Sequence, residues 1–238
     1  MPQRLMHNII YEIEPCGKLI EKLPDLLYSR FVYNSTARNK FGGEQMKKVQ
    51  IESKRRIFDD FFKIEEAILR YERFDGQMSN PVRRLNFDRG DSVAAIILNQ
   101  ETHRVILTNQ FKYPTYEKGP GWITEVVAGV LEANEDPEEA MRREIMEETG
   151  YEANNLTYIA TFYVSPGGSS ERIILYYAEV DSAGKVASGG GLAAEGEDIQ
   201  LLEFSLPELW SALASSQFVD AKTLIALLWL QNKMGAGK

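Results

Sequence analysis

Three glutamates stand at helical spacing in the middle of the chain, at Glu144, Glu147 and Glu148. Residues three and four positions apart share one face of an α-helix, so the three carboxylates are expected to converge. Like charges at this spacing repel each other by about 0.2–0.5 kcal/mol per pair, which stability alone would not favour. A hard divalent cation, which prefers carboxylate oxygens, would make the arrangement favourable. The spacing therefore indicates a metal site, and the alternative explanation is an acidic helix face exposed to water.

The residues around these glutamates predict the helix that must position them. Asp136 suits the N-cap and Pro137 suits the first helical position. Gly150 offers a left-handed end to the helix. We therefore predict a helix over 137–149, on which Arg143 lies within reach of the glutamates.

The stretch from residue 129 to 151 also resembles a known sequence signature, the Nudix box. That signature combines a glycine, a glutamate, an Arg-Glu pair, two further glutamates and a final glycine at fixed spacing. At about 5–7 % usage per residue type, the probability of a chance match in a chain of this length is far below about one in a million. The chain is therefore similar to Nudix hydrolases. The positions that match the box are Gly129, Glu135, Arg143, Glu144, Ile145, Glu147, Glu148, Gly150 and Tyr151.

The resemblance implies hydrolysis of a phosphoanhydride that links a nucleoside to another group through a diphosphate. It also implies Mg²⁺ as the cofactor, for which Mn²⁺ can substitute, because a divalent cation neutralises the diphosphate and lowers the pKa of bound water. By the same resemblance, Glu144, Glu148 and the backbone carbonyl of Ala128 are the expected metal ligands. Glu147 is expected to assist them in catalysis.

Four further residues of the box are expected to keep the site in shape. By the resemblance, Arg143 and Glu135 would hold the loop and the ligand helix in register. Arg143 is also counted with the catalytic group. Gly129 and Gly150 would support the site at the two ends of the box.

A second acidic cluster stands near the C-terminus and contains Glu195 and Glu197. In ADP-ribose pyrophosphatases, a glutamate on the loop before the last strand approaches the metals when the loop closes. The glycines at 189–191 and 196 would permit such a movement. The resemblance leads us to assign Glu195 as the general base and Glu197 as a further metal ligand, with the reverse assignment open. The alternative to both is an acidic loop exposed to water.

Three residues are candidates for binding the substrate. Glu171 ends the run Ser-Pro-Gly-Gly-Ser-Ser-Glu, which resembles the loop by which ADP-ribose pyrophosphatases contact the terminal ribose, although such a run is also an ordinary turn. Lys112 stands where these enzymes commonly have an arginine that faces the diphosphate, and lysine keeps the charge but loses the bidentate fork. Arg84 belongs to a basic cluster that would hold phosphate or a partner subunit, and a role as surface charge is the alternative.

These signals favour a Mg²⁺-dependent ADP-ribose pyrophosphatase that yields AMP and ribose 5-phosphate. The sequence Ser-Ser-Glu-Arg at 169–172 favours ADP-ribose, whereas Gly-Gly-Gly-Leu at 189–192 favours a hexose compound. GDP-mannose or UDP-glucose is therefore the alternative substrate. A sensor that binds such a ligand without cleaving it is an alternative of another class, which is disfavoured because every carboxylate of the box is present.

The composition sets limits on partners and location. The chain has 238 residues, of which 44 % are apolar and 26 % charged, and its net charge is −8. An acidic chain of this kind is not expected to bind nucleic acid or an anionic membrane. Cys16 is the only cysteine, which excludes an internal disulfide and favours a reducing cytoplasm. The longest apolar run, at 224–230, is too short to span a bilayer.

The apolar runs predict a mixed α/β domain, and the resemblance implies the Nudix α/β/α sandwich with a small N-terminal antiparallel β-sheet. We expect an extension of unknown role over 1–48, that sheet over 49–80, and the Nudix hydrolase domain over 81–238. In related pyrophosphatases the N-terminal sheet is exchanged between subunits, so the resemblance implies a homodimer.

The pattern of apolar residues, turns and caps also predicts the individual elements. A short helix is expected over 18–28, and the two last helices are expected to follow Ser205 and Asp220, the second ending before Gly235. Strands are predicted over 49–58, 61–74, 92–98, 104–113, 122–128, 156–164, 172–180 and 198–204.

Overall fold

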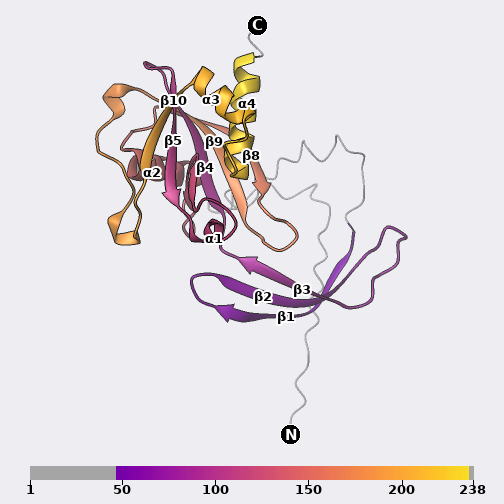
Figure 1. Ribbon diagram of the computed structural model, residues 1–238. Helices are drawn as coiled ribbons and strands as arrows, with labels where there is room; N and C mark the ends of the chain where they lie inside the picture. The colour runs from indigo at the N-terminus through magenta and orange to yellow at the C-terminus, as the bar shows by residue number, and fades with distance from the viewer. Residues whose placement is uncertain (1–46, 236–238) are drawn as a thin grey trace, which may run out of the picture. The chain divides into compact units, whose positions relative to one another are not determined.

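The computed structural model describes residues 47–235 of the chain (Figure 1). These residues form two compact units, divided between Phe87 and Asp88. The helix predicted over 18–28, and the extension predicted over 1–48 as far as residue 46, lie outside the described residues.

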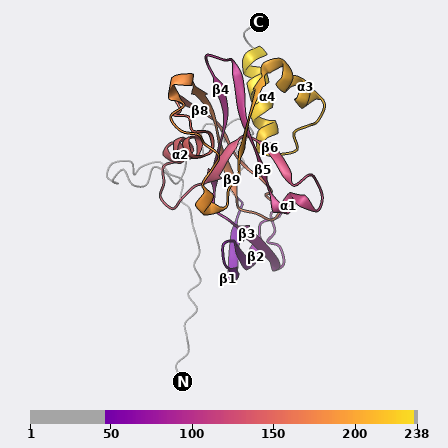
Figure 2. The ribbon, with the colours of Figure 1, turned by 60° about the vertical axis from the view of Figure 1, so that its left-hand side comes forward.

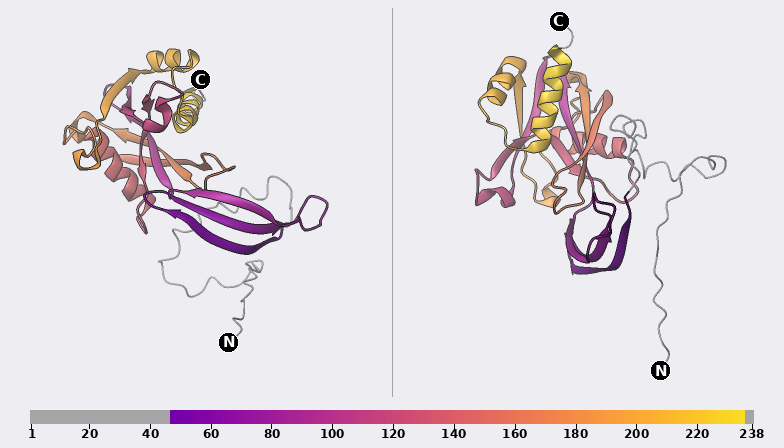
Figure 3. Two further views of the ribbon diagram at one scale, coloured as in Figure 1. Left: turned by 60° about the horizontal axis from the view of Figure 1, so that its bottom comes forward. Right: turned by 90° about the vertical axis from the view of Figure 1, so that its right-hand side faces the viewer.

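The first unit is a three-stranded sheet, whose strands run side by side in Figure 3. Its strands are β1 (Val49–Asp59), β2 (Lys63–Tyr71) and β3 (Val82–Asp88), and β2 lies between the other two. β1 and β2 form an antiparallel hairpin. In the turn of this hairpin, the Asp60 carboxylate accepts the backbone N–H of Phe61 at 2.8 Å.

One carboxylate joins the three strands of the first unit. Glu66 on β2 accepts a hydrogen bond from Arg55 on β1 at 2.7 Å and a second from Arg83 on β3. These hydrogen bonds hold the pKa of Glu66 below its usual range. The central strand is therefore connected to both neighbours by charge as well as by its backbone.

The second unit is built on a mixed sheet of seven strands. Five of them lie in the order β10-β5-β4-β9-β8, while β6 pairs with β5 and β7 pairs with β4. β4 and β9 run parallel, whereas β5 is antiparallel to β4, β6 and β10. The strands are β4 (Ser92–Asn99), β5 (Arg104–Phe111), β6 (Trp122–Glu125), β7 (Val127–Val130), β8 (Asn155–Tyr163), β9 (Arg172–Val180) and β10 (Gln200–Ser205).

Helices complete the second unit. None of the helices within residues 47–235 is long and apolar enough to cross a membrane. The sequence does not predict the shortest helix, α1, or two single 3-10 turns, because elements of three or four residues carry no periodic signal. The helices are α1 (Tyr113–Tyr116), α2 (Pro137–Thr149), α3 (Leu206–Ala214) and α4 (Ala221–Gly235), and the 3-10 turns are Ser182–Gly184 and Ala193–Glu195.

The central strand β4 shows how the sheet is covered on both faces. All its residues are buried, and successive side chains point to opposite faces. Ile96 packs in one core with Leu227 of α4, and Ile97 packs in the other core with Ile145 of α2. Figure 2 accordingly shows α2 on one side of the sheet and α3 and α4 on the other. The predicted α/β/α sandwich is confirmed.

The two ends of α2 agree with the prediction. The Asp136 carboxylate accepts the N–H groups of Glu138 at 2.9 Å and Glu139 at 3.3 Å, as an N-cap does. Gly150 has a φ of 73°, in the left-handed region. A Cβ atom at this position would also lie 2.1 Å from the Ala187 carbonyl oxygen. Both the conformation and the space therefore require glycine.

The last two helices begin where their caps predict. At the start of α3, Ser205 and Glu208 form a full capping box. Before α4, the Asp220 carboxylate accepts the N–H of Thr223 at 2.8 Å. The expectation that this helix ends before Gly235 is wrong, since α4 includes that residue. Glycine can adopt helical as well as left-handed conformations, so its presence alone does not fix the end of a helix.

The prediction of one strand over 122–128 is wrong in one respect. The structure has two strands there, β6 and β7, which are separated by Val126. The Val126 N–H donates to Thr223 Oγ1 of α4 at 2.9 Å. Thr223 is fully buried, so this bond fixes the point where the chain leaves β5 as its partner and joins β4. The two residues stand 97 positions apart, and a bond over that separation has no sequence signal.

Replacing Thr223 with valine is expected to destabilise the protein, because the buried N–H of Val126 would lose its acceptor. An unsatisfied buried group costs about 1–3 kcal/mol, so the midpoint of thermal unfolding should fall by several degrees. Thr157→Val, at an exposed position of β8, is the matched control and should change the free energy of unfolding by less than about 0.5 kcal/mol. Equal midpoints for the two variants in calorimetry would contradict this role of Thr223.

Candidate active site

Three carboxylates surround the guanidinium group of Arg143. Its Nη1 atom lies 2.8 Å from Glu144 Oε1 and 3.2 Å from Glu147 Oε2. Its Nε and Nη2 atoms bind the two carboxylate oxygens of Glu135 at 3.0 and 3.1 Å. Two parallel charged hydrogen bonds are the geometry that the guanidinium fork favours. They hold the loop before α2 against the helix.

The charges in this group change one another's pKa. The hydrogen bond from Arg143 holds the pKa of Glu135 below its usual range, and the same bond raises the pKa of Arg143. Glu135 therefore stays ionised at neutral pH, and the loop stays tied to α2. Burial raises the pKa of Glu144, although the neighbouring Arg143 charge opposes this effect.

Gly129 allows the Glu144 carboxylate to lie against the backbone of β7. A Cβ atom at residue 129 would stand 1.9 Å from Cδ and Oε1 of Glu144, so any side chain here would displace the carboxylate. Ala128 precedes Gly129 on β7. The carboxylate expected to bind a metal thus lies beside the peptide whose carbonyl is expected to do the same.

Glu148 is the buried carboxylate of the group and is 5 % exposed. Within residues 47–235, its Oε2 atom is buried without a hydrogen-bond partner. Burial raises the pKa of Glu148 to about 8, and the charges of Glu125 and Glu144 act in the same direction. A buried ionised oxygen without a partner is costly, and a bound cation would remove that cost. The environment of Glu148 therefore fits a metal ligand.

The donors available to a cation here are the carboxylates of Glu144 and Glu148 and the carbonyl oxygen of Ala128. All are oxygen atoms, the donor type that hard divalent cations prefer. In the part of the chain that the structure describes, no group of three or more carboxylate, imidazole or thiol side chains is arranged to hold a metal by itself. A site in this place would therefore draw on the backbone carbonyl and on water as well, as sites for hard cations commonly do.

The glycines at 189–191 lie against the C-terminal end of α2. The N–H groups of Gly190 and Gly191 donate to the backbone carbonyls of Glu148 at 2.8 Å and Glu147 at 3.1 Å. They satisfy carbonyls that the helix itself leaves without a donor. The sequence predicts that these glycines permit movement. In the structure, two of them cap the C-terminal end of α2, the helix that carries the carboxylates.

The two glutamates of the second acidic cluster have different surroundings. Glu195 ends the 3-10 turn Ala193–Glu195 and is exposed. Glu197 is half-buried, and its Oε2 atom accepts the N–H of Leu192 at 2.9 Å. In addition to burial, the charge of Glu197 raises the pKa of Glu148. The structure thus brings Glu197 towards the α2 carboxylates and leaves Glu195 at the surface of the loop.

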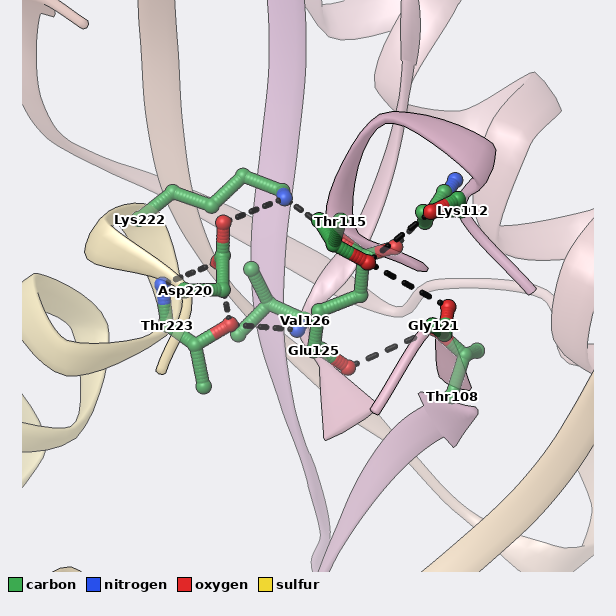
Figure 4. A network of polar contacts seen from close by, with 9 residues as sticks. All are labelled: Thr108, Lys112, Thr115, Gly121, Glu125, Val126, Asp220, Lys222 and Thr223. Atoms are coloured by element: carbon green, nitrogen blue, oxygen red, sulfur yellow. Dashed lines mark hydrogen bonds and ion pairs between the residues drawn. The ribbon is translucent and has the colours of Figure 1, made fainter. Parts of the chain in front are cut away.

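Lys112 has a charged partner that the sequence does not reveal. Its Nζ atom lies 3.2 Å from Oε1 of Glu125, a buried carboxylate at the end of β6. The other Glu125 oxygen accepts from Lys222, whose Nζ atom is 3.0 Å from Asp220 Oδ1 (Figure 4). The sequence marks Asp220 as a helix cap, but nothing in it joins Lys222 to a glutamate 97 positions away.

The remaining two substrate candidates lie in different units. Glu171 is buried at the start of β9, where its Oε1 atom accepts from Ser92 Oγ at 3.2 Å and lies 3.5 Å from Arg89 Nε. Arg84 lies on β3 of the first unit and donates to the backbone carbonyl of Arg83 at 3.0 Å. Glu171 is therefore held in place by neighbours, whereas Arg84 is exposed.

Comparisons with known proteins identify the family of the chain. The NUDIX domain family matches residues 88–227. The chain is 35 % identical over 181 residues to a GDP-mannose pyrophosphatase of Pectobacterium atrosepticum, which covers 75 % of this chain and 92 % of that relative. It is 34 % identical over 185 residues to an ADP-ribose pyrophosphatase of Escherichia coli K12, with 77 % and 88 % covered.

A solved structure shows the same fold. The crystal structure of an ADP compounds hydrolase matches with a TM-score of 0.62 and 19 % identity, covering 82 % of this chain and 98 % of that one. Nudix proteins generally use divalent cations, which suits Glu148, whose Oε2 atom has no hydrogen-bond partner in the part of the chain that the structure describes. The family match extends over more than half of the chain, and both relatives exceed 30 % identity over about three quarters of it. The chain therefore belongs to the Nudix hydrolase family.

Proposed function

We propose that this protein hydrolyses the diphosphate linkage of ADP-ribose to AMP and ribose 5-phosphate, with Mg²⁺ as its cofactor. The observation that carries the proposal is the buried Oε2 atom of Glu148, which has no hydrogen-bond partner among the described residues, in a helix whose Glu144 lies against Gly129. The Escherichia coli relative is named for this substrate. GDP-mannose is the second candidate substrate, because the Pectobacterium atrosepticum relative is named for it and is 35 % identical.

The proposed reaction adds one water molecule to a phosphoanhydride. The water oxygen forms a bond to one phosphorus, the bond from that phosphorus to the bridging oxygen breaks, and the bridging oxygen leaves on the other phosphate. A bound divalent cation supplies charge neutralisation of the diphosphate and a lower pKa for water, and Mn²⁺ can substitute for Mg²⁺ in this role.

The α2 carboxylates are proposed as the cation-binding group. Glu144, Glu148 and the carbonyl oxygen of Ala128 would hold the cation. Arg143 would orient Glu144 and Glu147 through its bonds of 2.8 and 3.2 Å. Because Arg143 is itself fixed by the loop before the helix, these carboxylates need little rearrangement before the reaction.

Two side chains are proposed to bind the substrate. Lys112 carries an exposed ammonium group beside the site and would bind the diphosphate. Glu171 would accept a hydrogen bond from the terminal ribose. Two observations support this role: Glu171 directly follows the loop 165–170, and its carboxylate is held by a hydrogen bond from Ser92.

Glu195 is proposed as the general base that takes the proton of the attacking water, and Glu197 as a further metal ligand. A base must have a free oxygen that can approach the water. Glu195 is exposed on a short turn, whereas Glu197 already accepts the N–H of Leu192 and lies towards the α2 carboxylates. These surroundings favour the stated division over its reverse.

The first unit is proposed to join two copies of the chain into a homodimer. Val49, Ile51 and Phe58 of β1 are 62, 49 and 49 % exposed. A three-stranded sheet cannot bury these side chains by itself, so a second subunit is the expected cover. Arg84 on β3 would then bind phosphate or the partner. A monomer in light scattering would contradict this proposal.

The proposed location is the cytoplasm. Cys16 is the only cysteine of the chain, so its fold depends on no internal disulfide, as is usual in reducing compartments. Recovery of the protein outside the cytoplasm after cell fractionation would contradict the assignment.

The substrate assignment predicts a preference within a panel of ADP-ribose, GDP-mannose, UDP-glucose and NADH in the presence of Mg²⁺. We expect the highest kcat/KM for ADP-ribose, measured by the phosphate that a coupled phosphatase releases from the products. If kcat/KM is highest for GDP-mannose, the proposed hydrolysis would stand and GDP-mannose would replace ADP-ribose as the substrate. Binding of ADP-ribose in calorimetry without hydrolysis of any compound would overturn the enzymatic proposal in favour of a sensor.

Glu148→Gln should lower kcat by about 100-fold or more, since even residues that only support a metal ligand typically contribute about 10–100-fold. The measurement is steady-state hydrolysis of ADP-ribose, with circular dichroism to show that the fold is retained. Glu139→Gln removes an exposed carboxylate of the same helix and is the matched control. A Glu148→Gln enzyme as active as this control would show that the metal assignment is wrong.

The division between base and ligand predicts two different losses. Glu195→Gln should lower kcat by about 100-fold or more at an unchanged Mg²⁺ requirement, because it removes only the proton acceptor. Glu197→Gln should instead raise the Mg²⁺ concentration that gives half-maximal activity. Titration of both variants with Mg²⁺ is the test, and identical curves would leave the division without support.

A further inference from the structure

The carboxylate of Glu125 is shared by two lysines from distant parts of the chain. Its Oε1 atom lies 3.2 Å from Lys112 Nζ, and its Oε2 atom accepts from Lys222 Nζ (Figure 4). The Glu125 side chain is 8 % exposed, whereas that of Lys112 is 40 % exposed. Lys222 thus lies on the buried side of this carboxylate, and Lys112 reaches towards solvent.

The inner lysine, Lys222, belongs to a fixed group on the first turn of α4. Its Nζ atom lies 3.0 Å from Asp220 Oδ1, and the other Asp220 oxygen accepts from Thr223 Oγ1 at 2.6 Å. Burial by itself would lower the pKa of Lys222, but the charges of Glu125 and Asp220 raise it above its usual value. Lys222 is therefore a permanent cation that holds the Glu125 carboxylate in place.

The outer lysine, Lys112, is held at its backbone as well. Its N–H donates to the Gly121 carbonyl at 2.7 Å, and its own carbonyl accepts from Thr115 Oγ1 at 2.8 Å. An ammonium group has three donors, and Glu125 takes one of them. The charge of Lys112 also acts on Glu148, whose pKa burial raises and Lys112 lowers. Its ammonium thus binds Glu125 through one donor and has further donors for a substrate.

We propose that Lys222 is a positioning residue for substrate binding: by occupying one oxygen of Glu125, it confines Lys112 to the other oxygen and so directs the Lys112 ammonium at the diphosphate. This inference rests on the proposed contact between Lys112 and the diphosphate. A lysine side chain has four rotatable carbon–carbon bonds and no rigid fork, so an external carboxylate is needed to orient it. Without Lys222, either oxygen of Glu125 would be open to the Lys112 ammonium, which would then lose its single fixed direction.

The first measurement tests the contact on which the inference rests. Lys112→Met should raise the Kd of α,β-methylene ADP-ribose, a diphosphonate that cannot be hydrolysed at the bridge, by about 10-fold or more, since it removes a charged hydrogen bond. The same variant should raise KM for ADP-ribose. An unchanged Kd would overturn the role of Lys112, and with it the inference, independently of the Lys222 variants.

The second measurement tests Lys222 itself. Lys222→Met should raise both Kd and KM by about 5–10-fold and change kcat by less than about twofold, because it disturbs binding and leaves the cation-binding carboxylates in place. In a Lys112→Met background, Lys222→Met should add no further increase in Kd. Ala226→Gly controls for destabilisation, since glycine weakens a helix interior and Ala226 is a buried residue of α4 outside the charged group, and its Kd should equal that of the parent.

A double variant separates orientation from charge. Glu125→Gln with Lys222→Met removes one negative and one positive group, so the net charge of the cluster stays as in the parent, and joint replacement of a buried ion pair is usually tolerated by the fold. If Lys222 acts by orienting Lys112, Kd should remain raised in this variant. A Kd restored to the parent value would show a pure charge effect and overturn the positioning role. A Kd for Lys222→Met no higher than that of Ala226→Gly would overturn it as well.

Discussion

The burial of Glu148 is the constraint on which the rest of the second unit depends. Its Oε2 atom is enclosed without a hydrogen-bond partner among the described residues, and burial raises its pKa to about 8. Such a group is unfavourable for folding, so the surrounding sheet and helices must supply the stability that it removes. The two cores on the faces of β4 do so, because that strand is buried along its whole length. The site is therefore tolerated by the fold and gains stability from a bound cation.

The helix that carries this carboxylate is fixed at both ends by different means. Before its first turn, Glu135 is held by the fork of Arg143, and at its last turn the carbonyl of Glu148 receives the N–H of Gly190. Between these ends, Glu144 fits only because residue 129 has no side chain. The carboxylates proposed to bind the cation are thus held by several contacts, while Glu195 stands on a short exposed turn. This division suits a reaction in which the metal site must be formed in advance and the proton acceptor must be able to approach.

Sequence reasoning succeeds here where the signal is local. The cap at Asp136, the left-handed end at Gly150 and the bounds of α2 depend on neighbouring residues, and β9 agrees with its predicted bounds for the same reason. It fails where two distant segments meet. The break at Val126 depends on Thr223, and one oxygen of Glu125 accepts from Lys222 of α4.

The Nudix box, being continuous, could be identified from sequence, whereas the group around Glu125 could not. Glu125 has no motif around it, and its two lysines come from the end of β5 and the start of α4. The glycines at 189–191 are an intermediate case. Their number indicates an unusual backbone, but only the fold shows that their N–H groups reach α2.

The contrast between two buried glutamates explains why a cation would select one place in this region. Glu125 and Glu148 are 6 and 5 % exposed, and each is removed from water to a similar degree. Glu125 has both oxygens bound by ammonium groups, so a metal ion would have to displace a lysine to reach it. Glu148 keeps an oxygen that has no partner within residues 47–235, and the nearby charge of Glu125 makes the ionised form of Glu148 still less favourable. The lysines thus satisfy the carboxylate of Glu125, and this difference in surroundings supports the proposal that Glu148, and not Glu125, binds the cation.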